Sequence, residues 1–153
     1  MGLYDRIEPR FMRCHGMGEV IMQTETFLKD FSPTFPAFPV YICPGDYRRI
    51  ECGRYTVTAR VVDDTDARPD EFECYTPEQI AAWKRGDWYF VGLVLSVSID
   101  GYTLDDHAAS LWGIDCNHPG GDNAYLQEIA NDLLPEAIEH AETIRASLLA
   151  KLA

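Results

Sequence analysis

The clearest hydrophobic pattern in the chain lies between residues 88 and 99, WYFVGLVLSVSI. Every second residue from Tyr89 onward is apolar, which is the period of a β-strand with one buried face. The other face is apolar at its start and polar at Ser96 and Ser98. The beginning of this strand is therefore expected to be covered on both faces, as in a central strand of a sheet.

A tight turn and a returning strand should follow this segment. Asp-Gly at 100–101 matches the two-residue type I′ turn, and the return strand is expected over about 102–113. A strict two-residue hairpin would place Asp106 opposite the core position Leu95. Because an aspartate there would face the core, we predict a bulge, fray or longer loop at 105–107.

Two further elements precede the hairpin. Residues 54–62, RYTVTARVV, alternate between apolar and polar side chains and predict a half-buried strand. Thr76-Pro77-Glu78-Gln79 has the residues of a capping box with proline at the first helical position, so a short helix should run from there to Gly86.

An amphipathic helical pattern occupies the C-terminal part of the chain. It follows the loop DCNHPGGDN, in which Asp122 or Asn123 is the expected N-cap, and Pro135 should either divide it into two helices or kink a single one. Its apolar positions recur at spacings of three and four: Leu126, Ile129, Leu133, Ala137, Ala141, Ile144, Leu148 and Leu152. The predicted class is α+β, with an antiparallel sheet (strands about 54–62, 88–99 and 102–113) packed by a C-terminal amphipathic helix or helix pair.

The 153 residues are expected to form one domain over 1–153. Residues 51–153 should form the body of sheet and helix. Residues 1–50 read as an irregular, Pro/Phe-rich part, whose aromatic side chains favour a loop packed on the body. The chain has no stretch that could span a bilayer and no apolar region of a signal peptide at its start, which predicts a soluble cytoplasmic protein with no membrane partner.

The formal net charge is −12, and it is unevenly distributed. Residues 1–60 are close to neutral, whereas 61–153 hold 18 acidic and five basic side chains. A field of this sign repels nucleic-acid backbone and favours basic partners or cations. We therefore expect no direct nucleic-acid binding; mimicry of nucleic acid is compatible, and so is an acidic surface that serves only solubility.

Acidic side chains cluster in the segment 63–73 and on the outer face of the C-terminal helical pattern. The segment could ligate a hard cation, but it lacks the order of an EF-hand loop, and a solvated loop is the preferred interpretation. The candidate partner-binding residues are Asp63, Asp64, Asp66, Asp70, Glu71, Asp105, Asp106, Glu128, Asp132, Glu136 and Glu139.

The cysteines and histidines offer the remaining candidate chemistry. Five cysteines stand at irregular spacings without a CxxC pair, which is typical of reduced structural thiols. Cys14 with His15, and Cys116 with His118, are weak candidates for metal ligands, because zinc sites usually show two compact ligand pairs. Cys116 beside His107 or His118 could also serve as a nucleophile. No cofactor is expected.

Three segments carry a resemblance to known sequences: WYFVGLVLSVSIDG, ASLWGID and AYLQEIANDLLPEAIEHA. From about Tyr55 onward, the chain resembles small, mostly uncharacterised proteins of bacteriophages, prophages and plasmids. The sharpest match is SLWGI at 110–114. The resemblance supplies no catalytic residues.

That resemblance implies an acidic accessory protein that binds a protein partner with a basic surface, and it could inhibit a nucleic-acid-processing defence protein. Two alternatives remain open: a small Cys/His-dependent hydrolase or metal-dependent enzyme, and a structural module that forms a homodimer.

Overall fold

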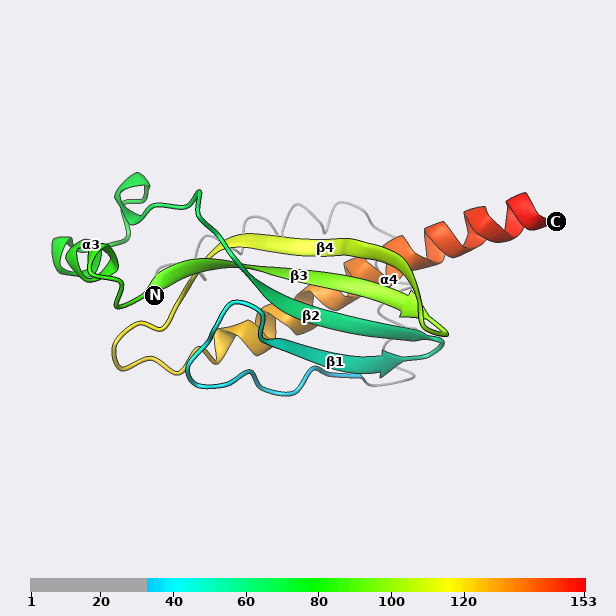
Figure 1. Ribbon diagram of the computed structural model, residues 1–153, viewed down its shortest axis with the longest axis horizontal. Coiled ribbons are helices and arrows are strands. Elements are labelled where there is room, and N and C mark those ends of the chain that lie inside the picture. The colour runs from blue at the N-terminus through cyan, green and yellow to red at the C-terminus, as the bar shows by residue number, and fades with distance from the viewer. Residues whose placement is uncertain (1–32) are drawn as a thin grey trace.

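The computed structural model describes residues 33–153 and shows a four-stranded antiparallel sheet with one long helix against it (Figure 1). The strand order is the sequence order, β1-β2-β3-β4. The elements are β1 (Tyr47–Cys52), β2 (Tyr55–Asp63), the short 3₁₀ helix η2 (Pro69–Glu71), α3 (Pro77–Lys84), β3 (Tyr89–Ile99), β4 (Tyr102–Cys116) and α4 (Tyr125–Leu152). The predicted α+β class is confirmed.

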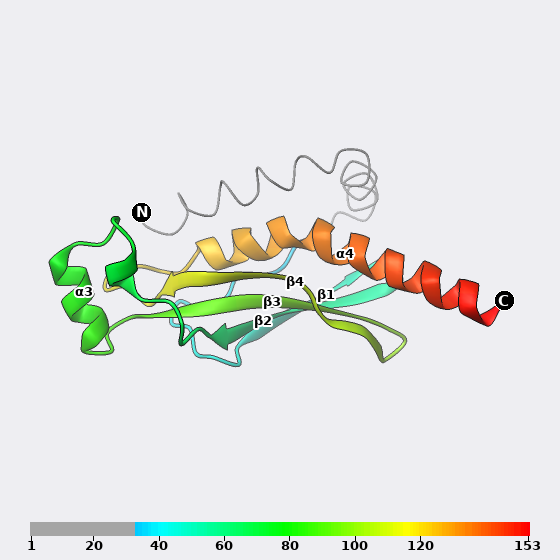
Figure 2. The same ribbon diagram turned by 90° about the horizontal axis from the view of Figure 1, so that it is seen from above.

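The helix α4 covers one face of the sheet, so that the protein has two layers (Figure 2). The alternation expected from the sequence decides which side chains enter the interface: Val57, Ala59 and Val61 of β2 and Leu93 and Leu95 of β3 are all buried. The helix contributes a stripe at spacings of three and four: Leu126, Ile129, Ala130, Leu133, Leu134, Ala137, Ile138 and Ala141. Their burial against the sheet is the main apolar stabilisation of the fold.

The strand β1 is an element that the hydrophobic pattern did not predict, since residues 47–50 were expected to be irregular. It pairs with β2 in a regular antiparallel register from Tyr47↔Arg60 to Cys52↔Tyr55. Its sequence, YRRIEC, has only Ile50 and Cys52 as apolar residues on the α4 side, because an edge strand buries little. The strand is held by its ladder with β2 rather than by its own pattern.

The Pro/Phe-rich segment before β1 packs on the body where the structure describes it. Phe35, Phe38 and Ile42 are buried in the same core as the α4 stripe. The main-chain N–H of Phe35 donates to the Asn131 side chain of α4 (2.7 Å), and that of Ile42 donates to Asn117 (2.9 Å). The expectation of an ordered, packed loop is confirmed for 33–44, while residues 1–32 lie outside the described part.

The β3–β4 hairpin shows the predicted irregularity. Its turn residues Asp100 and Gly101 both have positive φ (50° and 82°), as a type I′ turn requires. Over the same paired span β3 has 11 residues and β4 has 15, and the register shifts at three places. The extra residues place Ala109, not Asp106, opposite Leu95, which keeps Asp106 out of the core.

The C-terminal pattern forms one continuous helix, so the single-helix alternative is correct and Pro135 lies inside α4. The expected N-cap is wrong: Ala124 occupies that position, and no side chain caps it. The Asn123 side chain is committed to a different contact, described below. In α3 the capping box of Thr76 and Gln79 is present as predicted. Within 33–153, no helix has the length and apolarity needed to cross a membrane.

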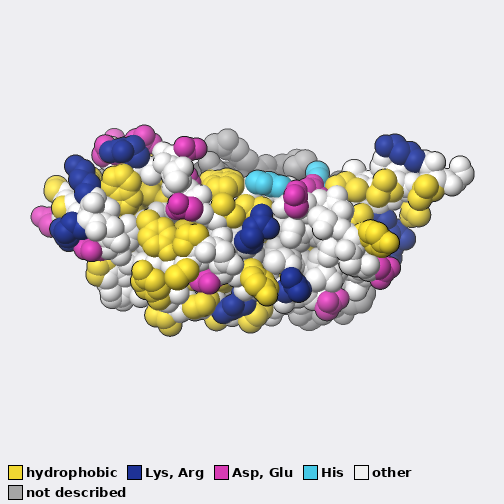
Figure 3. Space-filling view, viewed as in Figure 1, with side chains coloured by type: hydrophobic (Ala, Val, Ile, Leu, Met, Phe, Trp, Pro, Cys, Tyr) yellow, Lys and Arg dark blue, Asp and Glu magenta, His cyan; other side chains and the backbone are white. Residues whose placement is uncertain are grey.

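The sheet face opposite α4 is covered only at one end. The excursion between β2 and β3, which contains η2 and α3, packs there and buries Trp88 and Phe90 in a second small core with Tyr75 and Ala82. This confirms that the start of the strand at 88–99 is covered on both faces. The rest of this face is open to solvent, as the space-filling view shows (Figure 3).

Candidate functional site

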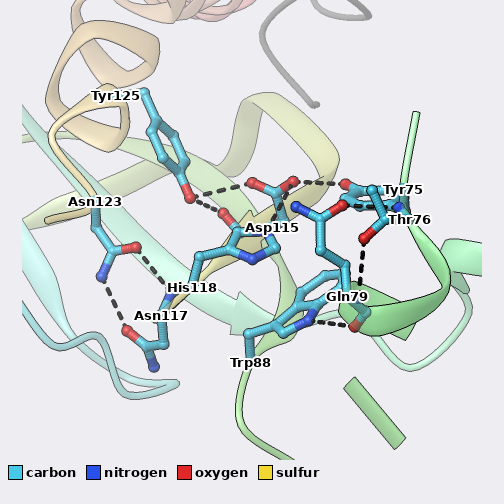
Figure 4. Close-up of polar contacts among 9 residues, drawn as sticks. All are labelled: Tyr75, Thr76, Gln79, Trp88, Asp115, Asn117, His118, Asn123 and Tyr125. Atoms are coloured by element: carbon cyan, nitrogen blue, oxygen red, sulfur yellow. Dashed lines mark hydrogen bonds and ion pairs between the residues drawn. The ribbon is translucent and has the colours of Figure 1, made fainter. Parts of the chain in front are cut away.

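A buried carboxylate, Asp115, lies at the C-terminal end of β4 and joins three parts of the chain (Figure 4). The Tyr75 hydroxyl donates a 2.5 Å hydrogen bond to Asp115 Oδ2, and the Tyr125 hydroxyl donates to Oδ1 at 3.2 Å. His118 Nε2 lies 3.3 Å from Oδ2. Tyr75 precedes α3, and Tyr125 begins α4. The carboxylate therefore connects the excursion, the end of the sheet and the start of the helix.

Two opposing effects act on the pKa of Asp115. Burial raises it, because a charged carboxylate loses its hydration. The hydrogen bonds from His118 and Tyr75 and the charge of His118 lower it, and the net pKa lies below the usual value. The carboxylate is therefore ionised at neutral pH and is held by the donors around it.

Aromatic side chains complete the group of residues around Asp115. We call this group the Asp115 cluster; its members are Tyr75, Trp88, Asp115, His118 and Tyr125. The Trp88 and His118 rings lie 4.2 Å apart between centroids, and Tyr75 stacks on Trp88 at 5.2 Å. Trp88 is completely buried, and its indole N–H donates to the Gln79 carbonyl (2.8 Å). His118 alone is partly exposed among the three rings. The arrangement fits a structural joint better than an open binding site.

Asn117 and Asn123 form a second polar contact next to this cluster. Both residues have positive φ (64° and 60°). The Asn117 main-chain N–H donates to the Asn123 side chain, and the Asn123 amide donates to Asn117 and to the Val40 carbonyl, each at 2.7–2.9 Å. These bonds attach the segment before β1 to the loop before α4, and they give the Asn117 N–H and the Val40 carbonyl their partners.

The structure argues against Cys116 as a nucleophile or a metal ligand. The side chain is completely buried, and burial raises the pKa of its thiol to about 12. A nucleophilic cysteine needs the opposite, a lowered pKa and access to solvent. His118 is paired with Asp115 instead. No group of three or more potential metal ligands occurs within 33–153, and Cys14 and His15 lie outside the described residues.

The acidic segment after β2 contains one carboxylate with a structural function. Asp64 Oδ1 accepts hydrogen bonds from the main-chain N–H groups of Asp66 and Ala67, and Oδ2 accepts one from Gly113 (2.8 Å). Asp70 forms an exposed ion pair with Arg68. The other candidates of this segment, Asp63, Asp66 and Glu71, are exposed.

The candidates on α4 form a row along its exposed side. Glu128, Asp132 and Glu136 follow one another at intervals of four residues and are exposed, and Glu139 continues the row half-buried. Burial, and then the neighbouring charge of Glu128, raises the pKa of Asp132. Burial, and then Glu139, raises the pKa of Glu136, against a lowering by His140. The row is thus a set of mutually repelling carboxylates.

The hairpin candidates Asp105 and Asp106 are separated by the bulge. Asp105 faces α4 and lies 2.6 Å from His140 Nε2, whereas Asp106 is exposed. Asp105 therefore ties β4 to α4.

The sequence analysis missed the residues that build the joint and the open sheet face. Tyr75 and Tyr125 carried no sequence signal, because a buried tyrosine in a core and one that donates to a carboxylate look the same in a sequence. Trp112 lies at the surface of the open face with 37% of its area exposed. Arg49 and Arg60 also lie on that face, opposite the strand neighbours Thr58 and Tyr47.

Comparison with known proteins identifies no relative: no family model, no curated protein and no solved structure matches the chain.

Proposed function

We propose that this chain is an acidic accessory protein of the phage or mobile-element type that binds a basic protein surface through α4. Its partner would be a nucleic-acid-processing defence protein, whose nucleic-acid groove the carboxylates would occupy. The observation that supports this best is the row Glu128, Asp132 and Glu136, which lies exposed on one side of a long helix.

The charge pattern around α4 supports this proposal. No lysine or arginine occurs in the sequence between Arg85 and Arg145, although the same stretch contains 11 acidic residues. Like charges at a spacing of four residues weaken a helix by a few tenths of a kcal/mol per pair. A basic partner would relieve this repulsion. Steering by such a field also accelerates association and makes it sensitive to salt.

The other acidic candidates fit a supporting role at most. Asp64 and Asp105 are engaged in hydrogen bonds within the fold, so they are unavailable for a partner. Asp63, Asp66, Asp70, Glu71 and Asp106 remain accessible at the surface. The contact would therefore be centred on α4.

A charge-reversal experiment tests this proposal. The full chain, the α4 variant D132K/E136K and a control variant E78K/D87K with the same change in net charge would be immobilised and exposed to bacterial lysate. We expect wild type and control to retain the same basic nucleic-acid-binding protein, and the α4 variant to lose it. Both 0.5 M salt and an excess of duplex DNA should release it. Retention by D132K/E136K, or binding that ignores salt and DNA, would contradict the proposal.

Self-association is a second candidate, supported by the end of α4. The helix extends past the strands, and Leu148, Leu149 and Leu152 are exposed there (Figure 2), Leu152 by 82% of its area. Light scattering during gel filtration would detect a homodimer. We expect L148E/L152E to be monomeric at concentrations at which wild type and S147E are dimeric. A wild-type monomer at high protein concentration would exclude this candidate.

A further inference from the structure

The open face of the sheet has a composition unlike the rest of this acidic protein. Its side chains form cross-strand rows in which hydroxyl groups and cations predominate. One row runs Tyr47–Arg60–Val94–Ser110, and the next runs Arg49–Thr58–Ser96. Beyond them, Glu51–Thr56–Ser98 includes the one acidic residue of these rows. Figure 3 shows hydrophobic and basic side chains in the middle of this face, with a few acidic ones between them.

A tryptophan lies flat on this surface instead of entering the core. The indole of Trp112 covers Gly92 so closely that a β-carbon at residue 92 would come within 2.3 Å of ring atom Cε3. The His107 ring is stacked beside it, 22° from parallel, and His107 Nε2 lies 2.9 Å from Ser110 Oγ. Trp112 still keeps 37% of its area exposed, so part of the indole is accessible to a planar ligand.

Two arginines on this face, Arg49 on β1 and Arg60 on β2, make no ion pair with any residue between 33 and 153. Arg49 lies over the Tyr47 ring (5.4 Å to its centroid), and its Nε donates to Thr58 Oγ1 at 3.3 Å. In a chain with net charge −12, two arginines that form no ion pair among the described residues are an exception, and the one carboxylate of the three rows, Glu51, accepts a hydrogen bond from Thr56. Their charges suit an anionic ligand on this face.

The acidic row on α4 does not cancel the positive field of these two arginines. It lies on the outer side of the helix, and a helix is about 10 Å across, so sheet and helix together separate the two surfaces. At physiological ionic strength, the screening length is about 8 Å. The global charge that argued against nucleic-acid binding therefore does not describe this face.

We propose that the open sheet face binds single-stranded nucleic acid. A base would stack on the exposed side of Trp112, and Arg49 and Arg60 would contact phosphates, with the serine and threonine hydroxyls as further donors. Aromatic side chains and arginines interleaved on one surface are the elements of single-strand binding. An acidic peptide would use the arginines but would leave Trp112 without a planar partner, so the nucleic acid is favoured.

The spacing of these side chains matches the length of a short segment of single-stranded nucleic acid. Neighbouring strands lie about 4.8 Å apart, so Arg60 on β2 and Trp112 on β4 are separated by about 10 Å across the sheet. A duplex could not place a base flat on the indole without unstacking. The site should therefore prefer single strands over duplexes. It goes beyond the proposed function, since it lies on the side opposite to the α4 row and both could be occupied together.

The experiment measures fluorescence anisotropy of labelled 12-nucleotide oligo(dT) and oligo(rU) with the full chain in 50 mM salt. We expect binding that W112A weakens about tenfold, the scale of one stacked base. W112F should retain most of the affinity, and Y102A, which removes an exposed tyrosine at the tip of the hairpin, should change nothing. R49A/R60A should weaken binding and reduce the dependence of log affinity on log salt by about 0.7 per arginine.

Four results would overturn the proposal: no binding of either oligonucleotide at low salt, equal affinity of W112A and wild type, equal affinity for duplex, or displacement of the oligonucleotide by polyglutamate at equal charge. The last would identify an acidic polypeptide as the ligand. Circular dichroism and thermal melts establish that each variant is folded. Failure here is distinguishable from failure of the proposed function, because W112A leaves the α4 row intact and D132K/E136K leaves the open face intact.

Discussion

The indole ring of Trp112 on β4 packs directly on the backbone of Gly92 on β3, and a β-carbon at residue 92 would lie 2.3 Å from it. Gly92 is itself buried under the ring. This one contact explains why a glycine interrupts the apolar first half of β3: the absence of a side chain lets an aromatic ring lie flat on the sheet. It also yields the first prediction.

Gly92→Ala should displace the Trp112 ring outward. We expect a loss of about 1–3 kcal/mol in the free energy of unfolding, the usual cost of overpacking, and a red shift of tryptophan fluorescence. A double-mutant cycle with Trp112→Ala isolates the contact, because the alanine at 92 should cost little once the ring is gone. A penalty that persists in the double mutant would show that the clash is not with Trp112.

Tyr75→Phe should destabilise the protein by about 1–2 kcal/mol, since it removes a donor from a buried carboxylate. Tyr125→Phe should do the same, because its hydroxyl donates to the same residue. Urea unfolding measures both. The control is Tyr102→Phe, whose hydroxyl lies at an exposed hairpin tip and should matter little. If all three variants behaved alike, the Asp115 cluster would not be the joint we describe.

The free energy of unfolding should fall in acid because the Asp115 carboxylate becomes protonated. Its folded-state pKa is lowered, by hydrogen bonds that outweigh burial, so its contribution is complete above the unfolded-state pKa of about 3.9 and is lost as the pH falls through the folded-state value. Asp132 affects the free energy of unfolding in the opposite direction. Because its pKa is raised in the folded state, protonation of Asp132 in acid stabilises the fold.

Unfolding measured between pH 2 and 7 checks both signs. We expect D115N to flatten the acid decline, and D132N to remove the opposing contribution and to stabilise the chain slightly at pH 7. A D115N curve parallel to wild type in acid would contradict the assignment.

The four cysteines of the described part should divide into two classes of reactivity. Cys43 and Cys74 are exposed, whereas Cys52 and Cys116 are buried with thiol pKa values raised by burial to about 11 and about 12. Brief alkylation with iodoacetamide followed by peptide mass spectrometry should label the first pair in the native protein and the second pair only after denaturation. Rapid native labelling of Cys116 would restore it as a candidate nucleophile.

The hydrophobic period determined most of the fold, because burial of one face imposes a period of two on strands and of about 3.6 on helices. It predicted β2, β3, β4 and α4, and the register problem at Asp106 predicted the bulge. β1 was not predicted, because an edge strand with charged side chains has no such period. The continuity of α4 through Pro135 was also open, since only packing on the sheet decides whether a helix tolerates an internal proline.

For the candidate sites, the sequence could show only residue types and their positions. It identified the acidic helix face, because four-residue spacing places side chains on one side of a helix whatever its surroundings. It could not show that Asp64 and Asp105 are used within the fold, or that Asp115 meets Tyr75 from 40 positions away. Nor could net charge reveal that Arg49, Arg60 and Trp112 share one face.

The chain by itself therefore determined most of the elements, their buried faces and the sign of the overall charge, which are properties of local pattern and composition. The tertiary structure alone decided which polar groups are occupied, where the cations gather and which aromatic ring stays at the surface. Those features depend on contacts between strands and helices that are distant in sequence, and a one-dimensional pattern does not contain them.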